Sequence, residues 1–470
     1  MSHAGSTTRS DHVNDTAIRV LVPTGMLGGG FPPETIERGL QLGADVIAVD
    51  GGSTDSGPFY LGSATPKTTR AQVEWDLRTL LKAAAEARIP LIVGSCGTGG
   101  TDAGVDWIAE ITTDILVAEG LDLAVAAIYS EQKDSALVER LAAGAIHPLP
   151  PHGALDATTL EGCTRIVGMM GHEPIEAALR GGAQVVLAGR ATDTAVAAAY
   201  PLMRGMPPGP AWHAAKIVEC GGQCTTDPRA GGVLATIDAH GFTIEPLNPA
   251  ASCTPASVAA HMLYETADPF RMREPAGTID VTAATYRAVD ERTVRVEGSE
   301  FEPAPQHTIK LEGARISGYE TMSFTAIRDP HILANIEEWA TLLHKVLGEW
   351  VARTLRLDVG DYAVDIRLYG HNAVLAEHDP ATGPAREVAV MLLVRAPDQA
   401  TATAIAKVAN PLMLHLPTAD MAYLPSTAFP FSPAETERGP AYEFVLNHVV
   451  DVDDPTELFR TEYRKAPADA

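Results

Sequence analysis

Short apolar runs that do not alternate with polar residues, each followed by a stretch of helical periodicity, restrict the fold of this chain more than any other feature. Runs of Val, Ile, Leu and Ala without alternation are typical of parallel strands that are buried on both faces. Strands that alternate with helices over short connections predict an α/β fold, in which a parallel sheet carries helices on both faces. The runs lie at residues 18–23, 45–50, 90–95, 123–129, 165–170 and 184–189.

The pattern changes after Gly221. Residues 231–327 alternate between apolar and polar side chains and contain turn residues, which predicts antiparallel strands. A long amphipathic helix follows, and then two strands, a helix and a last strand predict a small α+β unit. We therefore predict four parts: a disordered tail (1–16), a parallel α/β domain with Gly-rich ligand-binding loops (17–230), an antiparallel β-rich region (231–330) and an α+β domain (331–470).

Length and charge limit the classes of protein that need to be considered. A chain of 470 residues, with 46% hydrophobic and 20% charged residues, is typical of a folded protein with two or three domains. Its formal net charge of −25 disfavours nucleic acids and anionic membranes as partners. No apolar run approaches the roughly 20 residues needed to cross a bilayer. Small anionic molecules remain candidate ligands, because a pocket can carry local positive groups.

The cysteines and the amino-terminal segment indicate the cellular compartment of the protein. Residues 1–16 are polar and lack the apolar region of a signal peptide. Five cysteines, an odd number in a chain without such a signal, are typical of reduced thiols. Cys220 and Cys224 are too widely spaced for a C-x-x-C pair, and no second pair completes a zinc site. We predict a cytoplasmic protein and assign no metal ligand.

Five of the predicted β-to-α loops are rich in Gly, Ser, Thr and Asp. In an open parallel sheet these loops emerge at the same edge, where ligands bind. Their glycines let main-chain N–H groups approach a ligand, and the helix that follows adds a positive dipole end. The set therefore predicts one shared pocket for a small anionic molecule. The residues that we expect to bind it are Thr24, Gly28, Gly29, Gly52, Ser53, Thr54, Ser56, Ser95, Gly97, Thr98, Gly99, His172, Thr192, Asp193 and Gln223.

The alternative for any single loop is that it only caps a helix or forms a tight turn. Thr101, Asp102, Thr192 and Asp193 are good N-cap residues, each worth about 1 kcal/mol against alanine. Capping accounts for one loop better than a pocket does, but it explains neither the triple glycine nor the S-T-D-S run. No loop has the G-x-G-x-x-G spacing, the lysine of a phosphate-binding loop or a complete G-x-S-x-G.

Several residues near these loops can carry acid–base or electrostatic chemistry. Carboxylates beside an arginine suit removal of a proton α to a carboxylate or thioester, with the arginine binding the substrate carboxylate. Arg190 follows a buried run, so it needs an anionic partner, either an internal carboxylate or a ligand. Asp50 can also cap a turn, and Cys220 can be a small buried hydrophobe. The catalytic candidates are Asp50, Asp55, Glu131, Arg190, Glu219 and Cys220.

Segments over most of the chain, about residues 18–450, resemble the acyclic terpene utilisation family. They are, in chain order, "ADVIAVDGG", "GSCGTGG", "GHEPIEAALRGGAQVVLAGRATDTAVAAAYP", "AAKIVECGGQ", "GYETMSF" and "DIRLYGHNAV", which is the order expected for the family. The resemblance implies a bacterial catabolic protein, in a pathway of branched acyl-CoA and carboxylate intermediates, with a lyase step. It transfers no catalytic assignment, and "GGSTDSGPFYLG" resembles a subgroup distinct from the terpene proteins themselves.

Three functional hypotheses follow. The first is an enzyme of lyase or hydratase type that acts on a small carboxylate or acyl-CoA, with main-chain N–H groups stabilising an oxyanion. The second is a non-catalytic ligand-binding subunit of a multi-chain catabolic complex. The third is a hydrolase that uses Cys220 or Ser95. No cofactor is required by the sequence; a divalent metal or a CoA-linked substrate remains open, and we expect a homo-oligomer.

Overall fold

The computed structural model of the chain describes residues 17–229, 231–378 and 383–464. Contacts within the chain divide it into two units. Unit 1 contains the residues up to Arg315 together with those from Phe444 onward, and unit 2 is Ile316–Glu443. Two long strands, β15 (Thr308–Ile327) and β18 (Glu435–Asp451), belong to both units. The four-part division that we inferred from the sequence stays a prediction.

Ten of the described strands form the main sheet of unit 1, in the order β12-β13-β9-β8-β1-β2-β3-β7-β4-β19. Its centre is parallel, because β1, β2, β3, β7 and β4 pair in parallel register. This confirms the predicted parallel α/β fold. The parallel strands are β1 (Ile18–Val22), β2 (Val46–Asp50), β3 (Leu91–Gly94), β4 (Val125–Tyr129) and β7 (Val185–Ala188).

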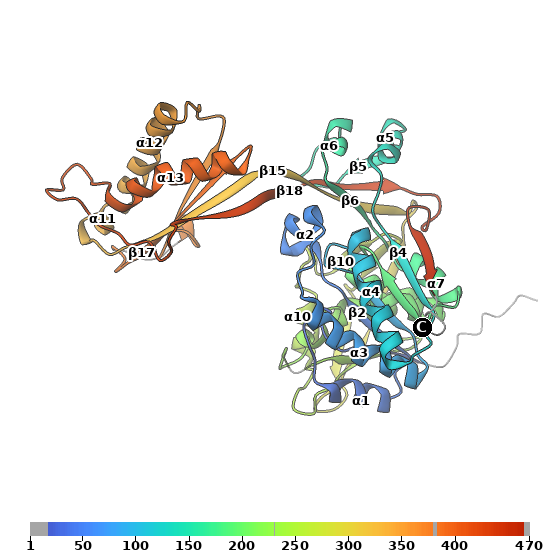
Figure 1. Cartoon of the computed structure of the whole chain (residues 1–470). Helices are drawn as coiled ribbons and strands as arrows, with labels where there is room; N and C mark the ends of the chain where they lie inside the picture. Colours follow the sequence, from blue (N-terminus) through green and yellow to red (C-terminus); the bar gives the residue numbers. More distant parts are fainter. Residues whose placement is uncertain (1–16, 230, 379–382, 465–470) are drawn as a thin grey trace, which may run out of the picture. The chain divides into compact units, whose positions relative to one another are not determined.

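Helices cover both faces of this sheet (Figure 1). Successive side chains of a strand point to opposite faces. Leu21 and Ile47 accordingly pack in one core with α1, α3 and α4, whereas Val20 and Ala48 pack in the other core with α7, α8 and α9. The helices of the two faces are α1 (Pro33–Gln41), α3 (Arg70–Ala87) and α4 (Asp102–Glu119), and α7 (Glu173–Arg180), α8 (Asp193–Met203) and α9 (Pro208–Val218).

One of the predicted parallel strands lies elsewhere. The apolar run at 165–170 forms β6 (Arg165–Met169), which pairs antiparallel with β15, from Met169 opposite Lys310 to Arg165 opposite Ala314. The prediction that this run belongs to the parallel sheet is wrong. Burial on both faces gives the run its apolar character, and that character does not specify which sheet the strand joins.

The region after Gly231 is antiparallel, as predicted, and four of its described strands extend the main sheet. β8 pairs antiparallel with β1, and β9, β13 and β12 continue outward from it. A separate three-stranded sheet packs nearby, and α10 precedes it in the chain. The elements are β8 (Val233–Ile237), β9 (Gly241–Pro246), β12 (Thr285–Ala288) and β13 (Val294–Glu297), α10 (Pro255–His261), and β10 (Arg271–Glu274), β11 (Gly277–Asp280) and β14 (Glu300–Pro303).

Unit 2 is a small α+β structure. Its part of β15 pairs antiparallel with β17 (Val388–Ala396), which pairs with β16 (Ala363–Tyr369). α12 (Ile336–Thr354) and α13 (Gln399–His415) cover this sheet, and they share one apolar core with it. The remaining elements of the chain are α2 (Pro58–Ser63), α5 (Asp134–Ala142), α6 (Ala157–Glu161), α11 (Pro330–Ala334), β5 (Ile146–Pro148), β19 (Arg460–Arg464) and the short 3-10 helices η1 (Thr54–Ser56), η2 (Gly221–Cys224) and η3 (Ala376–His378).

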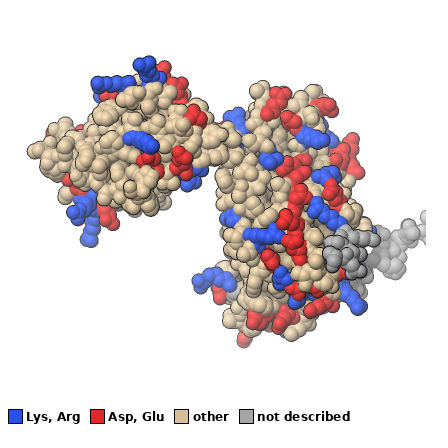
Figure 2. Space-filling model, viewed as in Figure 1, with Lys and Arg blue, Asp and Glu red and all other residues tan. Residues whose placement is uncertain are grey.

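Acidic side chains are distributed over the surface. On the face that Figure 2 shows, Asp and Glu side chains are interspersed with Lys and Arg. Among the described residues, no helix combines the length and the apolar composition that crossing a membrane requires.

Candidate functional site

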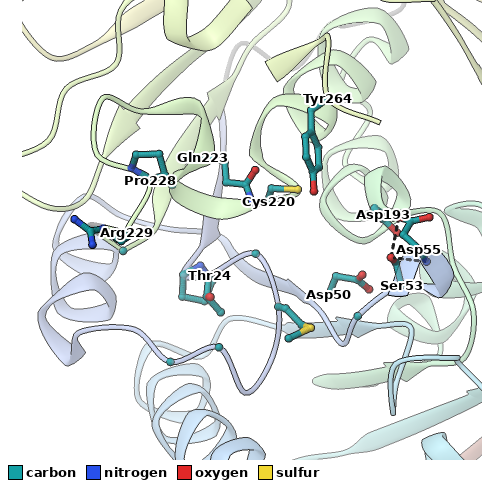
Figure 3. Close-up of a pocket in the computed structure, with 18 of the residues that line it drawn as sticks. Thr24, Asp50, Ser53, Asp55, Asp193, Cys220, Gln223, Pro228, Arg229 and Tyr264 are labelled. Carbon is teal, nitrogen blue, oxygen red and sulfur yellow. Dashed lines mark hydrogen bonds between the residues drawn. The ribbon is translucent and has the colours of Figure 1, made fainter. Parts of the chain in front are cut away.

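Polar loops of unit 1 meet around a cavity of about 740 Å³ at the carboxyl ends of β1 and β2 (Figure 3). The loops after both strands line it, together with the start of α8, the turn after α9 and the residues after α10. Segments that are distant in the sequence thus meet at the edge of the sheet where ligands bind in such folds. Of the predicted residues, those that line the cavity are Thr24, Gly29, Asp50, Gly52, Ser53, Asp55, Ser56, Asp193, Cys220 and Gln223.

The other predicted residues do not line this cavity. Most of them contact the loops that form its wall. Gly28 donates its main-chain N–H to Asp76 of α3 at 2.6 Å, which fixes the loop after β1. Thr54 is buried and donates to Glu312 at 2.9 Å. The remaining members of this group are Ser95, Gly97, Thr98, Gly99, Glu131, His172, Arg190, Thr192 and Glu219.

The loop after β3 packs behind the loop after β2. The main-chain N–H of Lys67 donates to Oγ1 of Thr98 at 3.0 Å, and a Cβ on Gly52 would lie 3.0 Å from the Cα of Thr98. Gly100 has a φ of +62°, and a Cβ there would lie 2.2 Å from the main-chain nitrogen of Arg190. The glycines of this loop therefore serve close packing of backbone, not ligand contact.

Close backbone contact also brings the turn after α9 to the cavity. A Cβ on Gly25 would lie 2.9 Å from the carbonyl oxygen of Cys220, and one on Gly221 would lie 2.9 Å from the nitrogen of Gly25. Glycine is required on both sides of this contact, and Gly221 has a φ of +59°. The contact places Cys220 and Gln223 opposite the loop after β1.

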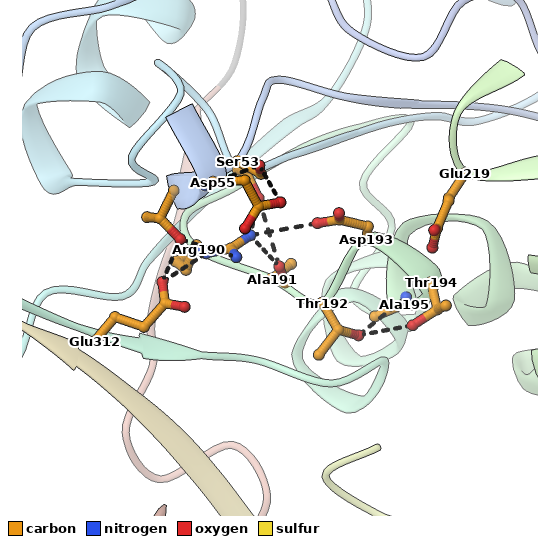
Figure 4. Close-up of polar contacts among 12 residues, drawn as sticks. Ser53, Asp55, Arg190, Ala191, Thr192, Asp193, Thr194, Ala195, Glu219 and Glu312 are labelled. Carbon is orange, nitrogen blue, oxygen red and sulfur yellow. Dashed lines mark hydrogen bonds and ion pairs between the residues drawn. The ribbon is translucent and has the colours of Figure 1, made fainter. Parts of the chain in front are cut away.

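Arg190 is buried, and its guanidinium binds groups of the protein itself (Figure 4). Nε donates to Glu312 at 3.0 Å, Nη2 donates to Thr54 at 3.3 Å, and Nη1 donates to Ser95 at 3.2 Å and to the carbonyl oxygen of Ala191 at 2.9 Å. Burial raises the pKa of Glu312, but Arg190 and Lys310 outweigh it and hold that pKa at about 2. Of the two partners that the sequence allowed for Arg190, the structure shows an internal carboxylate, Glu312.

Four carboxylates face the cavity: Asp50, Asp55, Asp193 and Glu265. Oxygen atoms of Asp55, Asp193 and Glu265 lie within 4.8 Å of one another. Burial, followed by repulsion from Asp193, raises the pKa of Asp50 well above its ordinary value. Burial also raises the pKa of Asp193 and of Glu265, and each is raised further by Asp55. The cavity therefore holds several acidic groups close together. Two basic residues, Lys67 and Arg229, also line it.

The residues around Cys220 form a second cluster. Glu219 is buried and makes an ion pair with Lys216, and Nε2 of His261 lies 4.0 Å from Oε1 of Glu219. Burial and the charge of Glu219 raise the pKa of the Cys220 thiol, which disfavours the thiolate. Burial lowers the pKa of His261 to about 4, so its imidazole is neutral at pH 7.

Glu131 and Thr192 both accept main-chain N–H groups at helix starts; for Thr192, capping is the alternative weighed above. Glu131 accepts the main-chain N–H of Asp102 at 3.0 Å at the start of α4, and it pairs with Arg165 at 3.3 Å. Thr192 accepts the N–H of Ala195 at 3.2 Å as the N-cap of α8, and it donates to Glu274 at 2.9 Å.

His172 lies away from the cavity, in a partly buried cluster at the start of α7. Its Nδ1 lies 3.3 Å from Glu173, whose Oε1 lies 3.8 Å from Nδ1 of His307, and its Nε2 lies 3.8 Å from Glu176. Burial lowers the pKa of His172 to about 4 and raises that of Glu173 to about 7. Oε2 of Glu173 is buried without a hydrogen-bond partner among the described residues.

Relative to the wild type, Glu173→Gln is expected to be more stable at pH 8 than at pH 5.5 by about 2 kcal/mol. The folded state holds a proton on Glu173 up to about pH 7, whereas the unfolded state loses it near its ordinary pKa of 4.5. The wild type therefore loses stability as the pH rises through this window, and the variant has no such loss. Denaturant unfolding at both pH values measures the difference. Glu86→Gln, an exposed change on α3, is the control, and an equal offset at both pH values would contradict the assignment.

Four further residues line the cavity that were not predicted from the sequence: Lys67, Arg229, Tyr264 and Glu265. Lys67 lies just before α3, where only a capping box around Thr69 is visible. Tyr264 and Glu265 follow α10 in a region of weak pattern. Glu265 lies in a turn just after a helix and has a φ of +51°. Nothing in the sequence distinguishes this glutamate from one in an ordinary surface turn.

The fold and this cavity define an α/β protein with a polar, carboxylate-rich site at the carboxyl edge of a parallel sheet. The chain belongs to the acyclic terpene utilisation family: the model of that family, described as acyclic terpene utilisation family protein AtuA, matches residues 64–430. This confirms the resemblance found in the sequence, and membership indicates a catabolic role. A search of curated proteins and one of solved structures gave no significant match.

Proposed function

We propose that the cavity is the active site of a catabolic enzyme of lyase or hydratase type, which removes a proton α to the carbonyl of a small carboxylate or acyl-CoA. The observation that carries the proposal is the convergence of buried carboxylates and Gly-rich backbone from distant segments on one polar cavity. A catalytic base with a raised pKa in a cleft is typical of such sites.

Asp50 is the base in this proposal. It is 7% exposed, and burial and the charge of Asp193 raise its pKa. Its carboxylate is therefore a stronger base than that of an exposed aspartate. The C–H bond of the substrate breaks, the proton goes to Asp50, and the electron pair is delocalised onto the carbonyl oxygen as an enolate. Elimination of a β-substituent, or its reverse with water, completes a lyase or hydratase reaction.

The loop after β2 supplies donors for the enolate oxygen. Gly52 and Ser53 line the cavity, and their main-chain N–H groups donate to no acceptor in the part of the chain that the structure describes. Preorganised donors of this kind stabilise an oxyanion. Lys67 donates to Ser56 at 2.9 Å and brings one positive charge to the same wall.

The two other hypotheses have less support. Ser95 is fully buried and bonded to Arg190, and the Cys220 thiol has a raised pKa, so neither suits a nucleophilic hydrolase. A pure binding subunit needs no base at all. It would therefore leave the burial of Asp50 without a purpose.

Hydrogen exchange at the substrate tests the proposal without knowledge of the full reaction. The protein is incubated in D₂O with a panel of short branched carboxylates and their CoA thioesters, and deuterium at the α-carbon is measured by mass spectrometry. We expect incorporation with at least one compound. Binding of a compound without incorporation or turnover would favour the binding subunit and contradict the proposal.

A further inference from the structure

We infer that Asp55, Asp193 and Glu265 bind a divalent cation of the magnesium, manganese or calcium type in the cavity. Oxygen atoms of these three side chains come from different elements, the loop after β2, the start of α8 and the turn after α10, yet they lie within 4.8 Å of one another. Two oxygens that both bind Ca²⁺ at about 2.4 Å can be at most about 4.8 Å apart. The three groups thus meet the distance condition for shared ligation.

Asp50 provides an independent observation at the same place. Its side chain lines the cavity and is 93% buried (7% exposed), and its Oδ1 has no hydrogen-bond partner among the described residues. In Figure 3 its carboxylate points to the side of the cavity where Ser53, Asp55 and Asp193 lie. A buried carboxylate oxygen without a partner is costly, and a cation in the adjacent space removes part of this cost.

Charge counts within the cavity point the same way. Asp50, Asp55, Asp193 and Glu265 are opposed there by Lys67 and Arg229, an excess of two acidic groups. Arg190 touches Asp193 through one long contact of 3.4 Å, and its other donors go to the protein interior. A divalent cation offsets this excess, and an anionic substrate can then enter.

The donor atoms select the kind of ion. Carboxylate oxygens from all three side chains suit magnesium, manganese or calcium. The neighbouring cluster of Glu219, Cys220 and His261 offers sulfur and nitrogen, but Lys216 pairs with Glu219 there and opposes a cation. The exposed positions of Asp55 and Glu265 leave coordination sites for water or for substrate oxygens.

A role for the cation in the reaction rests on the proposed function, whereas binding itself does not. Bound beside Asp50, the cation would bind the substrate's carboxylate or carbonyl oxygen. The chemistry that it supplies is polarisation of that oxygen.

Manganese binding tests the inference with the full chain and without substrate. The protein is freed of metal with a chelator, and Mn²⁺ is titrated with detection of free Mn²⁺ by electron paramagnetic resonance. We expect one site per chain, competition by Mg²⁺ or Ca²⁺, and at least a tenfold weaker site in Glu265→Gln and in Asp193→Asn. Asp122→Asn, an exposed change outside the cavity, is the control and should bind as the wild type does.

Either of two results would overturn the inference: no saturable Mn²⁺ site in the wild type, or unchanged binding in the folded Glu265→Gln protein. Glu265 is exposed, so this variant is expected to fold, and a thermal melt verifies it. Binding of Mn²⁺ without α-proton exchange would contradict the proposed function alone. Full exchange in metal-free protein would contradict only the role of the cation in the reaction.

Discussion

Asp50→Asn is expected to lower the rate of α-proton exchange by about 10²–10⁴-fold, the usual contribution of a positioned general base. Asparagine has nearly the same shape as aspartate but does not accept the proton. The main effect should be on kcat and not on KM, because the main-chain donors of Gly52 and Ser53 and the charge of Lys67 are unchanged. The effect is measured as the rate of α-deuterium incorporation into the compound on which the wild type is active.

The same variant separates a catalytic role from a structural one. Asp50 is a buried carboxylate with an unpartnered oxygen, so replacing it with a neutral amide should not destabilise the protein. Asp122→Asn is the matched control, since this residue is exposed between α4 and β4, away from the cavity. Undiminished exchange in a folded Asp50→Asn protein would refute Asp50 as the base.

Arg190→Met is expected to destabilise unit 1 by about 3–5 kcal/mol, because it leaves Glu312 buried with most of its compensating charge removed. Glu312 is also bonded to Lys310 at 3.0 Å and to Thr54, but the guanidinium is its buried partner. The variant also leaves Ser95 and the carbonyl of Ala191 without a donor that they have in the wild type. Denaturant unfolding measures the loss.

The double variant Arg190→Met/Glu312→Met provides the control. Replacing both members of a buried ion pair by apolar residues of similar volume is often close to neutral, so we expect the double variant to be more stable than Arg190→Met alone. A loss below about 1 kcal/mol in the single variant, or equal losses in both, would show that the pair does not hold these loops together.

The sequence predicted the elements of the fold better than their arrangement. Val46–Asp50 and Leu91–Gly94 were recognisable as parallel strands, since two buried faces demand unbroken apolar runs. The same character is shared by Arg165–Met169, which joins β15 instead, and the choice of partner depends on residues over 140 positions away. Likewise β19 pairs with β4, although the intervening chain passes through unit 2.

The site was predicted in part for a similar reason. The rule that ligands bind at the carboxyl ends of parallel strands selected Asp50, Asp55 and Asp193, and the structure brings these three residues together around one cavity. It also selected Ser95 and Arg190, which come from the same edge but face inward, because edge position does not determine the direction of a side chain. Glu265 reaches the cavity from the turn after α10, and the packing of α10 against η2, β12 and α9 brings it there.

Amide hydrogen–deuterium exchange of the whole protein tests the central claim most directly. It is measured with and without the compound into which the wild-type protein incorporates deuterium. If distant loops form one active site around the cavity, the compound should slow exchange together in residues 24–30, 51–56 and 264–265, and the Asp50→Asn protein, which still binds, should show the same pattern. Protection confined to other segments, with these three unchanged, would contradict the claim.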